Sequence, residues 1–177
     1  EDLDKALASF RNAIRHDDRH YNAWYGLGAI FYRQERLELA ECHFRRAVMI
    51  NTRSSVLYCY LAMVLNAFNT AEKNAAALSL LRHACTLDPK NPQLHFQLAT
   101  VLCAAGTAQC LYEAMSELKI VKEYAPKEPP VFTLLGQLCH KLGRSQEALR
   151  YFNTAIDLDP KQTNILKVVC HADTLLL

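Results

Sequence analysis

One short block of residues recurs five times along the chain at nearly constant spacing. Each copy has a small residue, a large apolar residue four positions later, and a small residue three positions after that. The closing residues are Ala13, Ala47, Ala84, Val121 and Ala155, so successive copies lie 34, 37, 37 and 34 residues apart. Residues three and four apart share one face of an α-helix. The recurrence therefore predicts an array of equivalent helices that pack through one face.

A second pattern precedes each of the last four blocks. It begins at Trp24, Tyr58, His95 or Phe132, with leucine three positions later and glycine or alanine directly after that leucine. A period of 34 residues with these two patterns is typical of the tetratricopeptide repeat, a two-helix unit. A single hairpin cannot bury its apolar face, whereas stacked hairpins share a continuous core. The predicted fold is therefore all-α, a tetratricopeptide-repeat superhelix (α-solenoid) of antiparallel helix pairs.

The two patterns also predict how the chain is divided. Residues 1–177 form a single array, in which residues 1–18 match only the second helix of a truncated repeat. Four repeats follow at residues 21–53, 54–91, 92–128 and 129–161, and residues 162–177 match a terminal helix. Capping helices of repeat arrays need a polar outer face, and neither end has one. We therefore expect the chain to be a piece of a longer array.

The second and third repeats each contain three additional residues. The additions fall at residues 66–76 and 104–113, between the first and second helix of each repeat. Three residues are nearly one helical turn, so either a longer first helix or a longer turn accommodates them. They reflect either tolerated variation in a loop or an edge of the array that contacts a partner.

Composition argues against several classes of protein. The net charge of +2 over 177 residues, without a basic stripe, disfavours a nucleic-acid-binding protein. The longest uncharged stretch, near residues 54–73, is interrupted by Asn66 and Asn69, so no membrane span is expected. Seven cysteines without a C-x-x-C pair fit buried thiols in a reducing compartment better than disulfides or a zinc ribbon.

Motifs for catalysis are missing from the sequence. It contains no nucleotide-binding glycine loop, no H-E-x-x-H motif and no G-x-S-x-G motif, and its seven histidines are dispersed. We therefore expect neither an enzyme nor a bound metal or cofactor. Arginines at positions 33, 36, 45, 46 and 53 alternate with glutamates at 35, 38 and 41. They form either a solvated helix face or a patch for an acidic partner.

The first helices of stacked repeats are expected to line a groove for an extended peptide. Its side chains are those that the packing patterns leave free, and we predict contacts from Asn22, Tyr25, Tyr32, Arg33, Cys59, Met63 and Asn66. Amides can bond a peptide backbone, tyrosines supply apolar area, and Arg33 can meet a carboxylate.

Particular segments of the chain resemble a known family. Residues 21–28 (YNAWYGLG), together with 31–35, 40–44, 54–57, 87–92, 126–128, 141–143 and 158–161, are similar to the Cdc-twenty-seven type of anaphase-promoting-complex subunit. The similarity covers nearly the whole chain and points to the C-terminal repeat region of that family. The core of residues 23–28 is shared with a sister subunit and discriminates less on its own.

The resemblance implies a non-catalytic scaffold of a multi-subunit ubiquitin ligase that acts in mitosis, in the nucleus and cytoplasm. Its partners would be activator proteins and core subunits, whose C-terminal Ile-Arg tails enter the groove, and neighbouring tetratricopeptide subunits. Family members homodimerise through N-terminal repeats that are missing from this chain. No acidic side chain is expected at the concave positions of the first helices to pair with the arginine of such a tail.

Two other readings remain open on the sequence, and a third is disfavoured. The chain could be a generic tetratricopeptide adaptor, or the repeat arm of a larger enzyme such as a glycosyltransferase. A chaperone-tail binder would clamp a terminal carboxylate with lysine and asparagine. Here those positions are occupied by Tyr25, Ala29, Tyr60, Gln93 and Gln97, so that clamp is missing.

Overall fold

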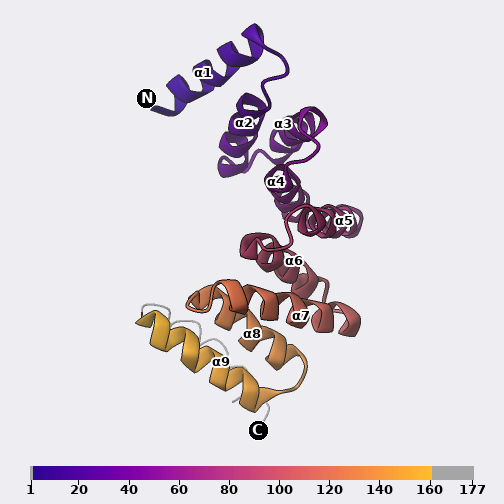
Figure 1. Cartoon of the computed structure of the whole chain (residues 1–177), viewed down its shortest axis with the longest axis vertical. Coiled ribbons are helices and arrows are strands. Elements are labelled where there is room, and N and C mark those ends of the chain that lie inside the picture. Colours follow the sequence, from indigo (N-terminus) through magenta and orange to yellow (C-terminus); the bar gives the residue numbers. More distant parts are fainter. Residues whose placement is uncertain (1, 161–177) are drawn as a thin grey trace. The chain divides into compact units, whose positions relative to one another are not determined.

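The computed structural model of the chain describes residues 2–160, and within that range it contains nine α-helices and no strand (Figure 1). The all-α prediction is therefore confirmed, while the predicted terminal helix at 162–177 lies outside the described residues. None of these helices is both long and apolar enough to span a bilayer. In chain order the helices are α1 Asp2–His16, α2 Tyr21–Arg33, α3 Leu37–Ile50, α4 Ser55–Ala67, α5 Ala71–Leu87, α6 Pro92–Ala105, α7 Ala108–Tyr124, α8 Pro129–Lys141 and α9 Ser145–Leu158.

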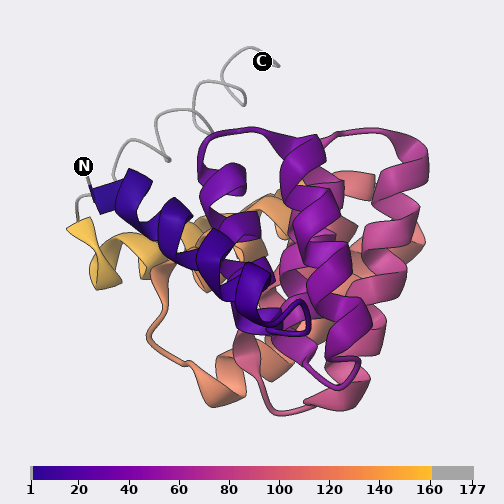
Figure 2. The ribbon, with the colours of Figure 1, turned by 90° about the horizontal axis from the view of Figure 1, so that it is seen from above.

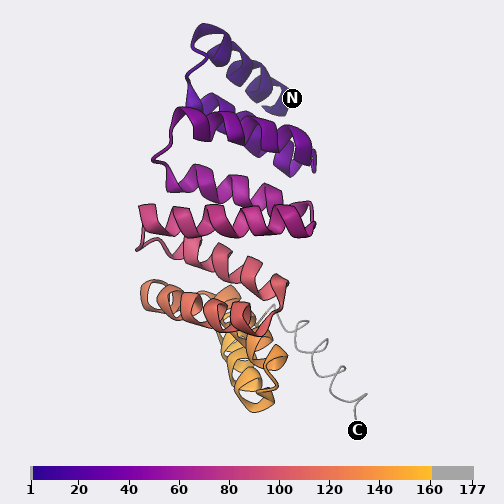
Figure 3. The same cartoon turned by 90° about the vertical axis from the view of Figure 1, so that its right-hand side faces the viewer.

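The helices form two compact units, Glu1–Gln97 and Leu98–Leu177, with the boundary inside α6. In the first unit α2 packs against α3 and α4 against α5 as helical hairpins, while α1 contacts α2 and α3 contacts α4. Figures 2 and 3 show α3, α4 and α5 lying side by side. In the second unit α8 packs against both α7 and α9. Neighbouring hairpins within each unit thus share their apolar faces.

The recurring block forms the core of these hairpins. In the last four copies its large residues are Phe44, Leu81, Leu118 and Phe152, each at most 1% exposed, whereas Phe10 of the first copy is half-buried. The small residues three positions later are also buried, which lets the paired helices approach closely. The prediction that this pattern marks the packed helix face is confirmed. Glycine occupies positions of close approach between helices; a Cβ on Gly136, for example, would lie 2.6 Å from the Phe152 ring.

The three additional residues of the second and third repeats lengthen the second helix of each. Helices α5 and α7 have 17 residues, whereas α3 and α9 have 14. The expectation of a longer first helix or a longer turn was therefore wrong. Each long helix begins after a threonine whose hydroxyl accepts a bond from the backbone N–H three residues on, Thr70 from Lys73 at 3.4 Å and Thr107 from Cys110 at 3.3 Å. These caps start the helix nearly a turn earlier.

The added turn of α5 forms an ion pair with α3, the second helix of the preceding repeat. Lys73 lies in that turn, and its Nζ is 2.7 Å from Oε2 of Glu41 on α3, which also pairs with Arg45 at 2.8 Å. Burial would raise the pKa of Glu41, but the hydrogen bonds from Lys73 and Arg45 outweigh it and lower that pKa. The Lys73 ammonium also lies over the Phe68 ring. The insertion therefore supplies an ion pair between neighbouring repeats.

Each described turn from a first to a second helix contains one residue in the left-handed region. These residues are Glu35 (φ 60°), Asn69 (54°), Gly106 (70°) and Gly143 (73°). Glycine adopts this conformation without steric cost, whereas other L-residues lose about 1–2 kcal/mol.

We expect Gly143→Ala to lower the free energy of unfolding by about 1 kcal/mol and Glu35→Gly to raise it by up to about 1 kcal/mol. No heavy atom lies within 4 Å of the position that a Cβ would take at Gly143, so the cost of the alanine would be conformational only. Urea denaturation followed by circular dichroism measures both changes. Shifts of the same sign in the two variants would contradict this explanation.

Candidate peptide-binding site

Helix α2 presents two rows of side chains. Asn22, Tyr25, Ala29 and Tyr32 form what we call the Tyr25 side, and Trp24, Leu27 and Phe31 form the Trp24 side. Neighbouring residues of a helix are rotated by about 100°, because one turn takes 3.6 residues. The two rows therefore project in different directions. Of the predicted groove residues on α2, Asn22, Tyr25 and Tyr32 belong to the Tyr25 side. Arg33 is the next residue in the sequence after Tyr32.

Tyr25 is the centre of an aromatic cluster formed by three helices. Its ring makes an edge contact with Tyr60 of α4 at 5.1 Å and lies 5.8 Å from Phe44 of α3. Tyr60 in turn stacks on Phe44 at 5.7 Å. Such pairs add about 0.5–1.5 kcal/mol beyond the area they bury. The cluster therefore fixes the position of Tyr25 relative to α4.

The environment of Tyr25 keeps its hydroxyl protonated. Burial, followed by the hydrogen bond with Tyr60, raises the pKa of Tyr25 to about 12, although the charge of Arg33 opposes this shift. Tyr25 is a neutral hydrogen-bonding group at physiological pH, as tyrosine ordinarily is, and a guanidinium lies nearby. An aromatic surface, a hydroxyl and a cation together suit the end of a peptide chain.

The predicted contact residues differ in their exposure to solvent. Asn22 and Arg33 are exposed, and Tyr25, Tyr32, Met63 and Asn66 are half-buried, so each can reach solvent. Cys59 is only 4% exposed, and burial raises its pKa to about 11. The prediction of Cys59 as a contact residue was therefore wrong, because its thiol belongs to the core.

Tyr60 is absent from the predicted set, yet it contacts the central side chain of the site. Its position lies outside those that the packing patterns leave free for the groove, although a chaperone-tail binder would use that position for its clamp. Tyr25 belongs to the preceding repeat. The contact between the two rings therefore cannot be predicted from the pattern within a single repeat. Comparing aromatic residues between neighbouring first helices would have been the signal to use.

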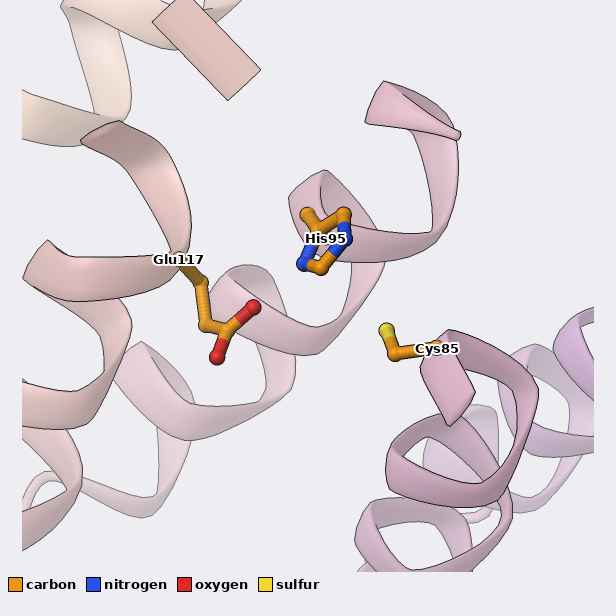
Figure 4. Close-up of side chains that lie close together, drawn as sticks. All are labelled: Cys85, His95 and Glu117. Carbon is orange, nitrogen blue, oxygen red and sulfur yellow. The ribbon is translucent and has the colours of Figure 1, made fainter. Parts of the chain in front are cut away.

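Cys85 of α5 and His95 of α6 lie on neighbouring helices of the first unit (Figure 4), and their ligand atoms are within 4.8 Å of one another. Glu117, also drawn there, belongs to the second unit. His95 is 5% exposed, and its Nε2 bonds the carbonyl oxygen of Pro89 at 2.9 Å. Cys85 and His95 together are fewer than the three or four protein ligands that zinc sites use. Because its ring bonds the Pro89 carbonyl, we assign His95 a structural role, in which it ties the α5–α6 turn to α6.

Comparison with known proteins agrees with this fold. Two family models, both described as tetratricopeptide repeat, match residues 1–55 and 129–162. YrrB, a TPR protein with an unusual peptide-binding site, is 26% identical with a TM-score of 0.76, covering 94% of this chain and 83% of that one. A thermophilic TPR protein of Thermus thermophilus is 24% identical with a TM-score of 0.76, covering 99% and 91%. The chain belongs to the tetratricopeptide-repeat family.

Two curated relatives show a similarity to a more specific group of proteins. Anaphase-promoting complex subunit 3 of Schizosaccharomyces pombe is 38% identical over 167 residues, which are 94% of this chain and 24% of the relative. Cell division cycle protein 27 homolog B of Arabidopsis thaliana is 40% identical over 149 residues, 84% of this chain and 19% of the relative. The chain therefore spans about a quarter or less of the length of these relatives. The resemblance to the Cdc-twenty-seven type of subunit is confirmed.

Proposed function

We propose that the chain is a non-catalytic scaffold and peptide-binding segment of an anaphase-promoting complex. The observation that carries this proposal is the match of 94% of the chain to a relative named as subunit 3 of that complex. Its partners would be activator proteins, core subunits and neighbouring tetratricopeptide subunits, in the nucleus and cytoplasm. The longer subunit would homodimerise through repeats N-terminal to those of this chain.

The Tyr25 side of α2 would receive the C-terminal Ile-Arg tails of those partners. The isoleucine side chain would pack on the ring surface of Tyr25 and Tyr60, which are held together at 5.1 Å. The terminal carboxylate would pair with Arg33, which is exposed and close enough to Tyr25 to affect its pKa. Asn22 would bond the peptide backbone from the same side of the helix.

A labelled peptide ending in Ile-Arg tests this proposal by fluorescence anisotropy. We expect saturable binding that is lost when the C-terminus is amidated, because amidation removes the carboxylate. The variant Tyr25→Ala/Arg33→Ala should bind about tenfold more weakly or worse, since it removes an aromatic contact and a charge-assisted bond. Arg53→Ala, which removes an exposed cation from the α3–α4 turn, should bind like the wild type.

A generic peptide adaptor is the second candidate, favoured by the similarity to YrrB, which is described as having a peptide-binding site. The same titration distinguishes the two functions. If amidation leaves affinity unchanged while Tyr25→Ala still weakens it, the groove binds peptides without reading their C-terminus. If neither change matters, the tail does not bind at the Tyr25 side.

A further inference from the structure

A second cleft lies on the other side of α2, between α1, α2 and α3. Its volume is about 430 Å³. The side chains that matter for its chemistry are Arg11 and Arg15 of α1, Trp24 and Phe31 of α2, Arg36 of the α2–α3 turn, and His43 of α3. All belong to the first unit. The cleft therefore opens from the Trp24 side, away from the proposed tail site.

Aromatic rings form the apolar part of this cleft. The His43 ring lies between Trp24, at 5.6 Å, and Phe31, at 5.1 Å. One polar atom of each of two rings is bonded to the backbone: the Trp24 indole N–H donates to the Asp18 carbonyl at 2.9 Å, and Nδ1 of His43 bonds the Leu39 carbonyl at 2.7 Å. These bonds hold the rings in place, so that the cleft offers a ligand an aromatic surface.

Positive charge surrounds these rings without a compensating acid. None of the described residues that line the cleft carries a carboxylate. Arg11, Arg15 and Arg36 are exposed, and no ion pair joins them to another residue within 2–160, whereas nearby Arg46 pairs with Asp18 at 3.6 Å. The Arg36 guanidinium lies over the Phe31 ring at 5.3 Å, which holds it beside the apolar part.

The second unit contains a cleft at the equivalent place of its repeat, and its lining includes an acid as well as cations. It lies between α7, α8 and α9, and its lining includes Phe132 and Tyr151, which occupy the repeat positions of Trp24 and His43. It also includes Lys122, Arg150 and Glu147, the last of which pairs with Arg144 at 3.6 Å. Among the described residues, two cations and one acid line this cleft, whereas three arginines and no acid line the first, so the first cleft is the more basic of the two.

We propose that the cleft between α1, α2 and α3 binds an acidic peptide segment of a partner protein. An apolar side chain of the peptide packs against Trp24 and Phe31, and flanking carboxylates pair with Arg11, Arg15 and Arg36. The argument for this occupant is charge complementarity combined with an apolar floor. A nucleic acid fits less well, because the chain as a whole carries a net charge of only +2. This interaction surface is separate from the proposed tail site.

Trp24 gives a direct readout of binding, because it is the only tryptophan in the sequence. The probe is the peptide Asp-Glu-Phe-Asp-Glu-Leu-Asp-Glu, titrated at low ionic strength by anisotropy when labelled and by Trp24 emission when unlabelled. We expect saturable binding with a change in Trp24 emission. Peptides with Asn and Gln in place of the acids, or Ser in place of Phe and Leu, should bind more weakly.

Matched variants locate the site. Arg11→Gln/Arg15→Gln should weaken binding about tenfold, as expected for the loss of two solvent-exposed charge pairs near the upper end of their range. Arg53→Gln/Arg150→Gln removes the same charge from elsewhere, including the second cleft, and should change affinity less than about twofold. Circular dichroism checks that both variants fold.

Several outcomes would overturn the proposal. These are no binding at millimolar peptide, equal binding by the Arg11/Arg15 variant, and saturation without any change in Trp24 emission. Displacement of the peptide by a single-stranded oligonucleotide that binds more tightly would identify a nucleic-acid surface instead. Self-association that the peptide competes for would identify a second copy of the chain. The Ile-Arg titration of the Tyr25 side is unaffected by any of these results.

Discussion

Replacing Phe44 with alanine is expected to lower the free energy of unfolding by about 3–5 kcal/mol, the largest effect of any single substitution considered for this chain. The Phe44 ring is 0% exposed, lies against Gly28, and supports the rings of Tyr25 and Tyr60. Its loss leaves a cavity among three helices, and because Gly28 has no side chain, the facing helix cannot fill it. The Tyr25 cluster would lose one of its three rings.

Urea denaturation of Phe44→Ala should be followed by two probes. Trp24 emission reports on the first unit, whereas circular dichroism reports on all helices, and the two need not coincide because repeat arrays often unfold in parts. Met49→Ala is the matched control, since Met49 lies on the same helix and is 69% exposed. It should change stability by less than about 0.5 kcal/mol. Equal effects of the two substitutions would show that Phe44 is not the centre of the hairpin.

The packed positions of this fold could be predicted because equivalent positions of each repeat form the contact between its two helices. Phe44 and Phe152 were identifiable as core residues from their spacing alone, and both are buried. The additional turn in α5 was harder to place. Its position depends on whether Thr70 caps a helix, and a threonine between two helical patterns is equally compatible with a longer turn.

The candidate sites were less predictable because they depend on contacts between repeats. The pattern within one repeat leaves Cys59 free to face a groove, but the neighbouring helices bury it. The same pattern gives no reason to associate Tyr60 with Tyr25. Likewise Arg11 and Arg36 are 25 positions apart in sequence, and only the packing of α1 against α2, and of α2 against α3, brings them to one cleft.

The repeats also show how the sizes of facing residues compensate. Two repeats have glycine in the first helix and phenylalanine in the second, Gly28 with Phe44 and Gly136 with Phe152, and in both pairs the ring lies where a Cβ would be. The other two have alanine and leucine at the equivalent positions, 62 with 81 and 99 with 118. The larger side chain thus occurs where the facing residue is smallest. This relation predicts that neither member of a pair can be changed alone without cost.

Gly136→Ala is therefore expected to destabilise the second unit, by up to about 2 kcal/mol. Alanine favours a helix over glycine by about 1 kcal/mol, but a Cβ placed 2.6 Å from the Phe152 ring forces overpacking that costs about 1–3 kcal/mol. Phe152 is 1% exposed, so its ring has no free space to move into. The steric term should therefore outweigh the gain in helix propensity.

Adding Phe152→Leu should reverse this loss, because the double variant recreates the alanine–leucine pair of the two middle repeats. Phe152→Leu alone leaves a gap beside Gly136 and should also destabilise, so the double-mutant cycle should give a stabilising coupling of about 1–2 kcal/mol. Urea denaturation of the four proteins, followed by circular dichroism, measures this coupling. Additive effects of the two substitutions would mean that the facing positions do not compensate in size, and that glycine is present at 136 for another reason.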